Sequence, residues 1–310
     1  MGKNEDETIE YFIYRISLTL ITLFGFLNNF MFFIVLCLRS LKSKYTNCIL
    51  RNQSIIDSSL CLITLLALNL PKTSSSGILF IDQISCSIWT GQYLEYCFIL
   101  AGEYNLVFTA VDRFWAVVTP SFYQKNINRK IILSFVFIYT FPVIFNWPQF
   151  IEFRLINGTC NSDYSDLGPN IVMFFKVNST MWVLFQYIIP VAIIIFLYWK
   201  VYKAMNKLKS NNEETKKATM KFTKATMIVV IIFMLTCFFD PFYYMLGYLG
   251  AVEYVFNSPL QLTGISLITI NSAVNPVVYF ITMKSFRKFY FDVFCRCRKR
   301  SNAIETSVFE

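Results

Sequence analysis

Six ionisable side chains stand inside, or directly after, stretches of the sequence that are otherwise apolar, and their chemistry requires partners. They are Asp57, Glu95, Glu103, Asp112, Arg113 and Asp240. A charged side chain in hydrocarbon costs about 2.5–3.5 kcal/mol on insertion scales, so each is expected to meet a cation or a polar group. The chain has no histidine and no Cys-x-x-Cys pair, so neither a histidine base nor a zinc site is expected. We predict a binding protein that is not an enzyme.

The elements that carry these residues are long apolar segments. Of all residues, 55% are apolar and 15% are charged, which is too little charge for the surface of a soluble domain. A helix needs about 20 apolar residues to cross a bilayer, whereas a barrel strand has about 10 of alternating polarity. The predicted spans are 16–38, 52–70, 89–111, 131–151, 177–199, 225–249 and 256–283. We therefore predict an all-α fold, a bundle of seven transmembrane helices.

Basic residues are divided unequally between the two ends of the predicted bundle. Of the 28 Lys and Arg residues, 23 fall on one side and five on the other. Basic residues in short loops are retained in the cytoplasm, so the amino terminus is placed outside the cell and the carboxyl terminus inside. The net charge of +9 is thus interpreted as a cytoplasmic collar for anionic lipid and not as a nucleic-acid-binding surface. The outer loops carry more acids than bases, which favours a cationic ligand.

The chain is predicted to have four parts. They are an extracellular tail (1–11), the membrane domain (12–284), an amphipathic eighth helix (285–297) and a cytoplasmic tail (298–310). The eighth helix has aromatic residues at helical spacing among basic ones, a pattern typical of helices that lie in the membrane interface. Cys295 and Cys297 at its end are predicted palmitoylation sites, with free thiols as the alternative.

Two covalent features are predicted for the outer loops. Cys86 and Cys160 both fall on the oxidising side of the membrane, so we expect a disulfide between them. Asn157-Gly158-Thr159 is a glycosylation sequon in which Asn157 is the acceptor.

The seventh predicted span contains the most specific motif. Residues 271–279 read Asn-Ser-Ala-Val-Asn-Pro-Val-Val-Tyr, which resembles the Asn-Ser-x-x-Asn-Pro-x-x-Tyr signature of rhodopsin-like (class A) G-protein-coupled receptors at every defining position. Within it, Pro276 breaks one backbone hydrogen bond, which Asn275 and neighbouring polar groups can satisfy. Other matching residues are Asn29, Asp57, Asp112, Arg113, Pro190, Tyr198, Pro241 and Phe286. The resemblance implies a multi-pass signalling receptor of the plasma membrane.

The resemblance also implies a polar cluster in the middle of the bundle. Asp57 would meet Asn29, Asn271 and Asn275 there. In the family, such a cluster holds a sodium ion in the inactive state, and the ion leaves on activation. Gly102 stands where a serine often helps to coordinate the ion, which departs from the family pattern.

A second implied element is an activation switch at the cytoplasmic end. Asp112 would hold Arg113 in the inactive state. When the sixth helix swings outward about Pro241, Arg113 would turn toward Tyr198 and Tyr279 and open a pocket for a heterotrimeric G protein. Arrestin is a further implied cytoplasmic partner.

Three residues are candidates for ligand contact. Glu95 lies on roughly the same helical face as Arg113, near pocket depth, although it could instead hydrogen-bond a neighbouring helix. Asp240 is a second acid on the sixth helix, and Phe239 stands where the family usually has a tryptophan. The predicted ligand is a basic or amidated peptide, and the alternative is a biogenic amine anchored by Glu95. No lysine lies in 256–283, so neither retinal nor another organic cofactor is predicted.

Two alternatives of another class are kept. A decoy receptor would bind ligand without signalling. A membrane transporter would show inverted repeats or helices broken at mid-membrane, and neither is seen in the sequence.

Overall fold

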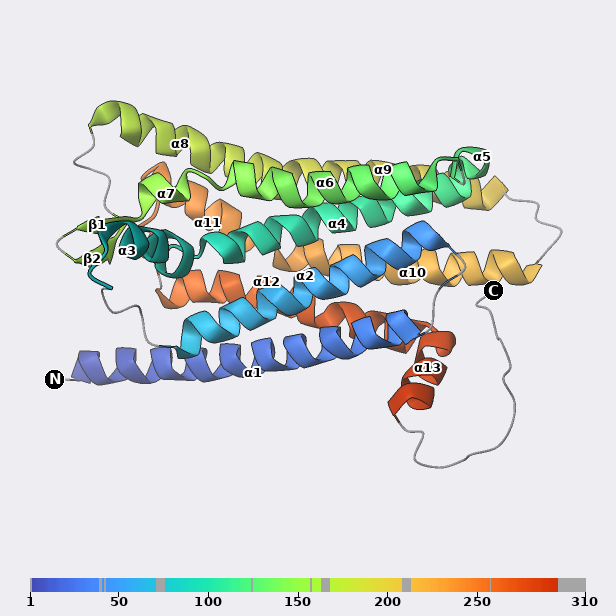
Figure 1. Ribbon diagram of the computed structural model, residues 1–310, viewed down its shortest axis with the longest axis horizontal. Helices are drawn as coiled ribbons and strands as arrows, with labels where there is room; N and C mark the ends of the chain where they lie inside the picture. The colour runs from blue at the N-terminus through green and yellow to red at the C-terminus, as the bar shows by residue number, and fades with distance from the viewer. Residues whose placement is uncertain are drawn as a thin grey trace.

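The computed structural model is a bundle of long helices that run side by side along one axis (Figure 1). It describes residues 2–38, 41, 43–70, 76–123, 125–156, 158–162, 168–207, 213–256 and 258–294. In this part of the chain, six helical segments are long and apolar enough to cross a membrane. They are Phe12–Leu38, Tyr93–Val118, Ile127–Glu152, Pro169–Met205, Thr219–Tyr248 and Pro259–Thr282.

Helix α2 (Lys44–Asn69) is the remaining long helix of the bundle. Its 26 residues reach about 39 Å at 1.5 Å per residue, more than the ~30 Å of the hydrocarbon layer. It is less apolar than the other helices because its buried face carries Asn52, Gln53 and Asp57. It packs against both α1 (Gly2–Leu38) and α4 (Tyr93–Val118). With α2, the bundle has the seven membrane-crossing helices that the sequence predicts.

The other long helices complete the bundle. They are α6 (Ile127–Phe145), α8 (Pro169–Val183), α9 (Ile189–Lys207), α10 (Glu213–Thr236), α11 (Phe239–Tyr248) and α12 (Pro259–Thr282). A π-helical turn, η3 (Leu184–Ile188), joins α8 to α9 as one long helix. The helices α10 and α11 form the sixth membrane helix and are separated by a short break before Pro241.

Several helices extend beyond the spans predicted from the sequence. Helix α1 begins at Gly2, before the predicted start of the membrane domain at residue 12. Helix α2 begins at Lys44 and α10 at Glu213. The predictions stopped at charged residues, but a helix continues into the headgroup layer, where water solvates the charged side chains. The predicted span 131–151 lies within the segment Ile127–Glu152, which is interrupted by a turn at 146–148 between the end of α6 at Phe145 and a short helix that begins at Gln149. Pro148 favours this interruption because it disfavours the helical conformation of the residue before it.

The third membrane helix also begins later than predicted. Helix α3 (Leu79–Ser85) and the π-helical turn η1 (Cys86–Thr90) form a separate segment in front of α4. Gln92 adopts the left-handed conformation, with φ of 57°, and breaks the chain direction there. At Gly91, a Cβ atom would lie 2.8 Å from the ring of Phe153, so only glycine fits. Cys86 therefore belongs to the outer segment and not to the membrane helix.

Hydrogen bonds between helices use backbone carbonyl groups that prolines and helix breaks leave free. In the π-helical turn, the carbonyl of Phe185 receives no hydrogen bond from Pro190, because proline has no N–H. The Tyr104 hydroxyl of α4 donates to this carbonyl instead, at 3.1 Å. At the break between α10 and α11, the Tyr187 hydroxyl donates to the carbonyl of Met234 at 2.8 Å. No water is available in the bilayer for such groups. These bonds therefore tie neighbouring helices together.

The proline of the seventh-helix motif is compensated by another helix. Pro276 leaves the carbonyl of Ser272 without its usual N–H, and the Asn29 amide of α1 donates to that carbonyl at 2.9 Å. The Asn28 amide donates to the carbonyl of Ala273 at 3.0 Å. The predicted partner, Asn275, points elsewhere. The Asn275 side chain instead donates to Asp57. The hydrogen bond that Pro276 removes from α12 is therefore replaced by one from α1.

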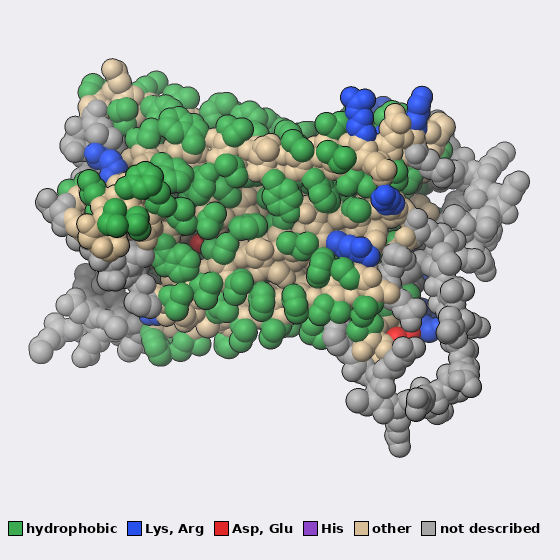
Figure 2. Space-filling view, in the orientation of Figure 1, with side chains coloured by type: hydrophobic (Ala, Val, Ile, Leu, Met, Phe, Trp, Pro, Cys, Tyr) green, Lys and Arg blue, Asp and Glu red, His purple; other side chains and the backbone are tan. Residues whose placement is uncertain are grey.

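The outside of the bundle is apolar along its middle, whereas its interior contains polar groups. Figure 2 shows apolar side chains covering this face, with most visible Lys and Arg side chains near the end where α5 (Pro120–Tyr123) and α13 (Lys284–Phe294) lie. On α6, Ile132 and Ile144 are 61% and 68% exposed, while Asp57 is 2% exposed. This distribution is the reverse of a soluble protein and fits a lipid surround.

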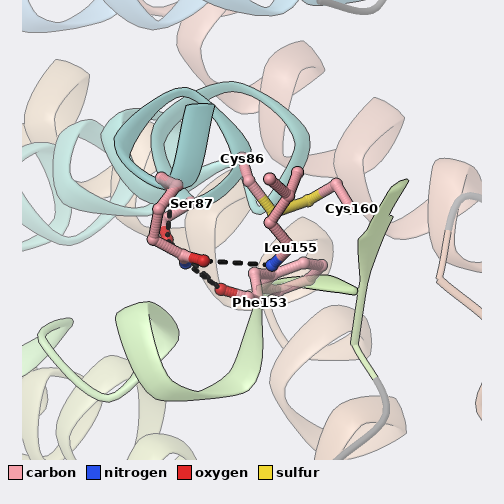
Figure 3. Close-up of a disulfide and its surroundings, with 6 residues drawn as sticks. Cys86, Ser87, Phe153, Leu155 and Cys160 are labelled. Carbon is pink, nitrogen blue, oxygen red and sulfur yellow. Dashed lines mark hydrogen bonds between the residues drawn. A yellow bond between two sulfur atoms is a disulfide. The ribbon is translucent and has the colours of Figure 1, made fainter. Parts of the chain in front are cut away.

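The outer end of the bundle is capped by a small hairpin. Strands β1 (Arg154–Ile156) and β2 (Thr159–Asn161) pair antiparallel, with Leu155 opposite Cys160. A disulfide joins Cys86 to Cys160, with the Cα atoms 5.5 Å apart (Figure 3). The Gln83 amide donates to the carbonyl of Phe153 at 2.8 Å and accepts from the N–H of Leu155 at 3.0 Å. The second outer loop is thus fastened across the mouth of the bundle.

The inner end carries the amphipathic helix α13, which runs across the bundle axis (Figure 1). It begins directly after α12, and its ring of Phe286 is 1% exposed. Phe286 packs on Phe32 of α1 with ring centroids 5.4 Å apart. The predicted eighth helix is present as Lys284–Phe294. Cys295 and Cys297, the predicted palmitoylation sites, lie outside the described residues, as does Asn157.

Candidate functional site

The interior of the bundle contains a chain of amide side chains around Asp57. Asn275 Nδ2 donates to Asp57 Oδ2 at 2.8 Å, and Gln53 Nε2 donates to Oδ1 at 3.1 Å. Gln53 stands four residues before Asp57, so both lie on one face of α2. Asn105 Nδ2 of α4 donates to Gln53 Oε1 at 2.6 Å and completes the chain. The network joins α2, α4 and α12 in the middle of the membrane.

Two residues predicted for this cluster do not hydrogen-bond Asp57. Asn29 is fully buried, but its amide donates to the backbone carbonyls of Gly25 and Ser272. Asn271 is 6% exposed, and its side-chain oxygen has no hydrogen-bond partner. The structure replaces them with Gln53, which the sequence analysis did not single out. Its i,i+4 spacing from Asp57 was the available signal.

The polar cluster offers few ligands for a sodium ion. A hard cation is held by several oxygen atoms, but Gln53 presents its N–H group to Asp57 and its oxygen to Asn105. A Cβ atom at Gly102 would lie 3.8 Å from Asp57 Oδ1, yet glycine supplies no side-chain oxygen. In the described part of the chain, no group of three or more His, Cys, Asp or Glu side chains could hold a metal. In this arrangement the amide of Gln53 takes a position at Asp57 Oδ1 that a sodium ion would need.

The inner end of α4 carries a buried ion pair. Arg113 is paired with Asp112, and its Nε donates to Asp112 Oδ2 at 3.0 Å. Thr46 of α2 donates its hydroxyl to the same oxygen at 2.8 Å and accepts from Arg113 Nη2 at 2.6 Å. Asp112 and Arg113 are 1% and 7% exposed. Because the charges are paired and hydrogen-bonded away from water, the pair holds Arg113 firmly in this arrangement.

Tyr123 closes the ion pair from the cytoplasmic side. Its hydroxyl donates to Asp112 Oδ1 at 2.6 Å and also contacts the hydroxyls of Ser43 and Thr46. Burial and the neighbouring charge of Asp112 raise the pKa of Tyr123 to about 12. The phenol is therefore protonated at neutral pH and acts as a donor. Nothing in the spacing of Thr46 or Tyr123 along the chain pointed to this role.

The sixth helix contacts Arg113 through an aromatic ring. The guanidinium carbon lies 4.3 Å from the centroid of the Phe222 ring of α10. Tyr279 of the seventh-helix motif stacks on the same ring, with centroids 5.9 Å apart. Tyr198 is buried beside these residues. The tyrosines predicted for the activated switch thus lie in the core, and neither donates to or accepts from Arg113 in this arrangement.

The predicted ligand residues are buried in the upper part of the bundle. Glu95 is 1% exposed and accepts a hydrogen bond from the Thr64 hydroxyl of α2 at 2.6 Å. Asp240 is also 1% exposed, and among the described residues neither of its carboxylate oxygens has a hydrogen-bond partner. It is pressed against α12, where a Cβ atom at Gly264 would lie 3.0 Å from Oδ1. Phe239 is half-buried and stacks on Tyr243 at 5.8 Å.

A cavity at the outer end is lined by other residues. It is lined by α4, the end of α6, the short helix α7 (Gln149–Glu152), the second outer loop, α8, α11 and the loop before α12. Neither Glu95, Asp240 nor Phe239 is among its lining residues, whereas Glu152 is. The sequence analysis counted Glu152 only as one of the outer acids. Its place in the cavity depends on the turn at Pro148 and could not be read from spacing.

The bundle has seven membrane helices, a buried polar core and, at its inner end, a buried arginine paired with Asp112. These features define the class of multi-pass membrane receptors. The chain belongs to the family described as 7 transmembrane receptor (rhodopsin family), whose sequence profile matches residues 27–279. It is therefore a class A G-protein-coupled receptor of the plasma membrane and not an enzyme. This membership sets aside the transporter alternative.

Individual relatives are similar at a low but extended level of identity. The chain is 26% identical to the trace amine-associated receptor 1 of Mus musculus over 78% of its length and 76% of that receptor. It is 26% identical to the histamine H2 receptor of Cavia porcellus over 97% of its length and 85% of that protein. It is also 26% identical to the galanin receptor type 1 of Rattus norvegicus, over 67% and 61% of the two chains.

Proposed function

We propose that this receptor binds a basic or amidated extracellular peptide and activates heterotrimeric G proteins through outward movement of the sixth helix, α10–α11. The observation that carries the proposal is the guarded Arg113, which is held by Asp112 and Thr46 and covered by Phe222. A buried arginine whose contacts come from three helices can be released when one of those helices moves. The inner end of the bundle is thus built for two arrangements.

Release of Arg113 would follow the contacts of the sixth helix. Outward movement of α10 would withdraw the Phe222 ring from the guanidinium of Arg113, which could then reach the buried hydroxyl of Tyr198. The space vacated at the inner end would admit the terminal helix of a G-protein α subunit. Pro241 and the break between α10 and α11 provide the hinge, because a proline removes one backbone hydrogen bond.

The peptide assignment is supported by the outer face. Acids outnumber basic residues in the predicted outer segments, and a peptide ligand can contact the loops as well as the bundle. The named relatives do not decide the ligand class, since they include the receptors for galanin, histamine and trace amines. Rhodopsin of Gallus gallus is 26% identical over 66% of the chain, but this chain has no lysine in 256–283 to hold retinal.

The second candidate is a biogenic amine anchored by Glu95. It is favoured by the burial of Glu95 at the first turn of α4, where an ammonium group could replace the Thr64 hydroxyl as its partner. The two candidates are separated by screening cells that express the full chain with amidated basic peptides and with monoamines. If Glu95→Gln leaves every response unchanged, the amine candidate fails.

The signalling step is tested separately with Arg113→Ala. We expect ligand binding to persist and the second-messenger response to disappear. The matched control is Arg129→Ala, which removes an exposed basic residue at the same end of the bundle and should leave the response intact. A response that survives Arg113→Ala contradicts the proposed switch, and a wild-type chain that binds ligand but never signals is a decoy receptor.

A further inference from the structure

Glu152 is a buried acid inside the outer cavity. It ends the short helix α7 and is 5% exposed. The hydroxyl of Tyr244 donates to Oε2 at 3.2 Å, and the hydroxyl of Tyr248 donates to Oε1. The N–H of Glu152 bonds to the carbonyl of Pro148 at 3.0 Å, which fixes the turn that points the acid inward. The side chain is therefore held in place from two sides.

The carboxylate has donors but no counter-ion. Across the described residues, Asp112 and Arg113 form the only ion pair, and Glu152 has no basic partner. Two carboxylate oxygens together offer about four acceptor positions, and two phenol hydroxyls leave some of these unused. A charge removed from water without a cation is costly. The site is thus prepared for a positively charged group.

The walls of the cavity are aromatic. The ring of Tyr244 lies 6.5 Å from Trp182 and 5.5 Å from Tyr254, measured between centroids. Trp182 also packs edge-on to Tyr96, with ring centroids 5.5 Å apart. Aromatic faces carry negative charge density and attract organic cations. A metal ion would need more oxygen ligands than these rings supply, so the lining favours an ammonium or guanidinium group on an apolar body.

We propose that Glu152, held by Tyr244 and Tyr248, anchors the ammonium or guanidinium group of the extracellular ligand in this cavity. The inference rests on the proposed function, since it names the anchoring acid of that receptor. It moves the anchor from Glu95, which does not line the cavity. Because both tyrosines belong to α11, the outer half of the sixth helix, a cation seated on Glu152 acts on the helix that moves.

The test uses purified full-length receptor and four small probes. N-acetylarginine amide and phenethylamine carry the two cationic groups. N-acetylcitrulline amide and 2-phenylethanol are their neutral counterparts of similar shape. The thermal unfolding midpoint is measured against probe concentration, which yields a dissociation constant for each. A stronger effect of the arginine probe indicates a peptide side chain as the source of the cation, and a stronger effect of phenethylamine indicates a free amine.

We expect at least one cationic probe to stabilise the receptor in a saturable manner, with little effect from its neutral counterpart. Glu152→Gln keeps the shape of the side chain and should weaken the cationic probe by roughly 10- to 100-fold, the range for loss of a charged hydrogen bond. The matched control is Glu253→Gln, which removes an exposed outer acid and should leave the dissociation constant unchanged.

Three results would overturn the proposal. They are stabilisation by the neutral probes equal to that by the cationic ones, no stabilisation by either cation, and loss of binding in Glu95→Gln but not in Glu152→Gln. The comparison of charged and neutral probes uses wild-type receptor alone, so it can refute the proposal even if Glu152→Gln does not fold. In that case Glu95→Gln provides the location, because cation binding that survives this variant excludes Glu95 as the anchor. Nucleotide exchange on G proteins is a separate readout, so failure of cation binding leaves the proposed signalling function intact.

Discussion

Removing the aromatic ring of Phe222 should raise the activity of the receptor in the absence of ligand. Arg113 and Phe222 are 7% and 6% exposed, so their contact at 4.3 Å is largely free of water. A desolvated cation–π contact contributes about 1–2 kcal/mol. If α10 moves outward on activation, this contact exists only in the inactive arrangement. Phe222→Leu keeps an apolar side chain but loses the ring, so it removes that stabilisation from one state.

The expected effect on basal signalling follows from this difference. At 1.4 kcal/mol for each factor of ten, 1–2 kcal/mol corresponds to roughly a 5- to 30-fold larger active population. Basal activity is measured as binding of a non-hydrolysable GTP analogue to heterotrimeric G protein, normalised to the amount of receptor in the membrane. Phe222→Tyr is the matched control, because it keeps the ring and should stay close to wild type.

The opposite change provides a second arm of the experiment. Phe222→Glu would give Arg113 an acidic partner on the sixth helix and should lower basal exchange below that of wild type. The reasoning is refuted if Phe222→Leu and Phe222→Tyr have equal basal exchange at matched expression. It is also refuted if Phe222→Leu falls below wild type.

Three further predictions concern the interior of the bundle. Replacing choline chloride by sodium chloride should leave the thermal unfolding midpoint of the receptor unchanged, because Gln53 already donates to Asp57. A midpoint that rises with sodium would show that the ion binds. Tyr104→Phe leaves a carbonyl of the π-helical turn unpaired and should cost about 1–3 kcal/mol of stability, measured as a lower midpoint. The control is Tyr202→Phe, because Tyr202 is exposed. An equal loss of stability in both variants would contradict a stabilising hydrogen bond between Tyr104 and Phe185. Asp240→Asn should leave the midpoint unchanged or raise it, since the carboxylate has no hydrogen-bond partner in the described part of the chain; a fall would reveal an interaction that the contacts do not show.

The number and orientation of the membrane helices follow from the sequence alone. An apolar stretch of about 20 residues and the side on which basic residues fall are local properties, and they require no knowledge of which helices touch. The seventh-helix motif likewise identified Asn275 as a partner of Asp57, and in the structure Asn275 Nδ2 donates to Asp57 Oδ2 at 2.8 Å. The disulfide between Cys86 and Cys160 followed from their shared side of the membrane. Helix ends were predicted less well, because helices continue past their apolar spans.

The partners of the buried polar groups were decided by the tertiary structure. Whether Asn29 meets Asp57 or the carbonyl freed by Pro276 depends on how α1 is rotated against α12, and the sequence contains no direct measure of that rotation. The same holds for the outer end, where the early stop of α6 turns Glu152 into the cavity while Glu95 faces Thr64 of α2. The sequence singled out Glu95 as an acid inside an apolar span, whereas Glu152 stood out only as one of several acids near the outer end. Packing of the helices paired Glu95 with the Thr64 hydroxyl and gave Glu152 the hydroxyls of Tyr244 and Tyr248 in the cavity. Such contacts depend on helix rotation and tilt, which composition does not specify.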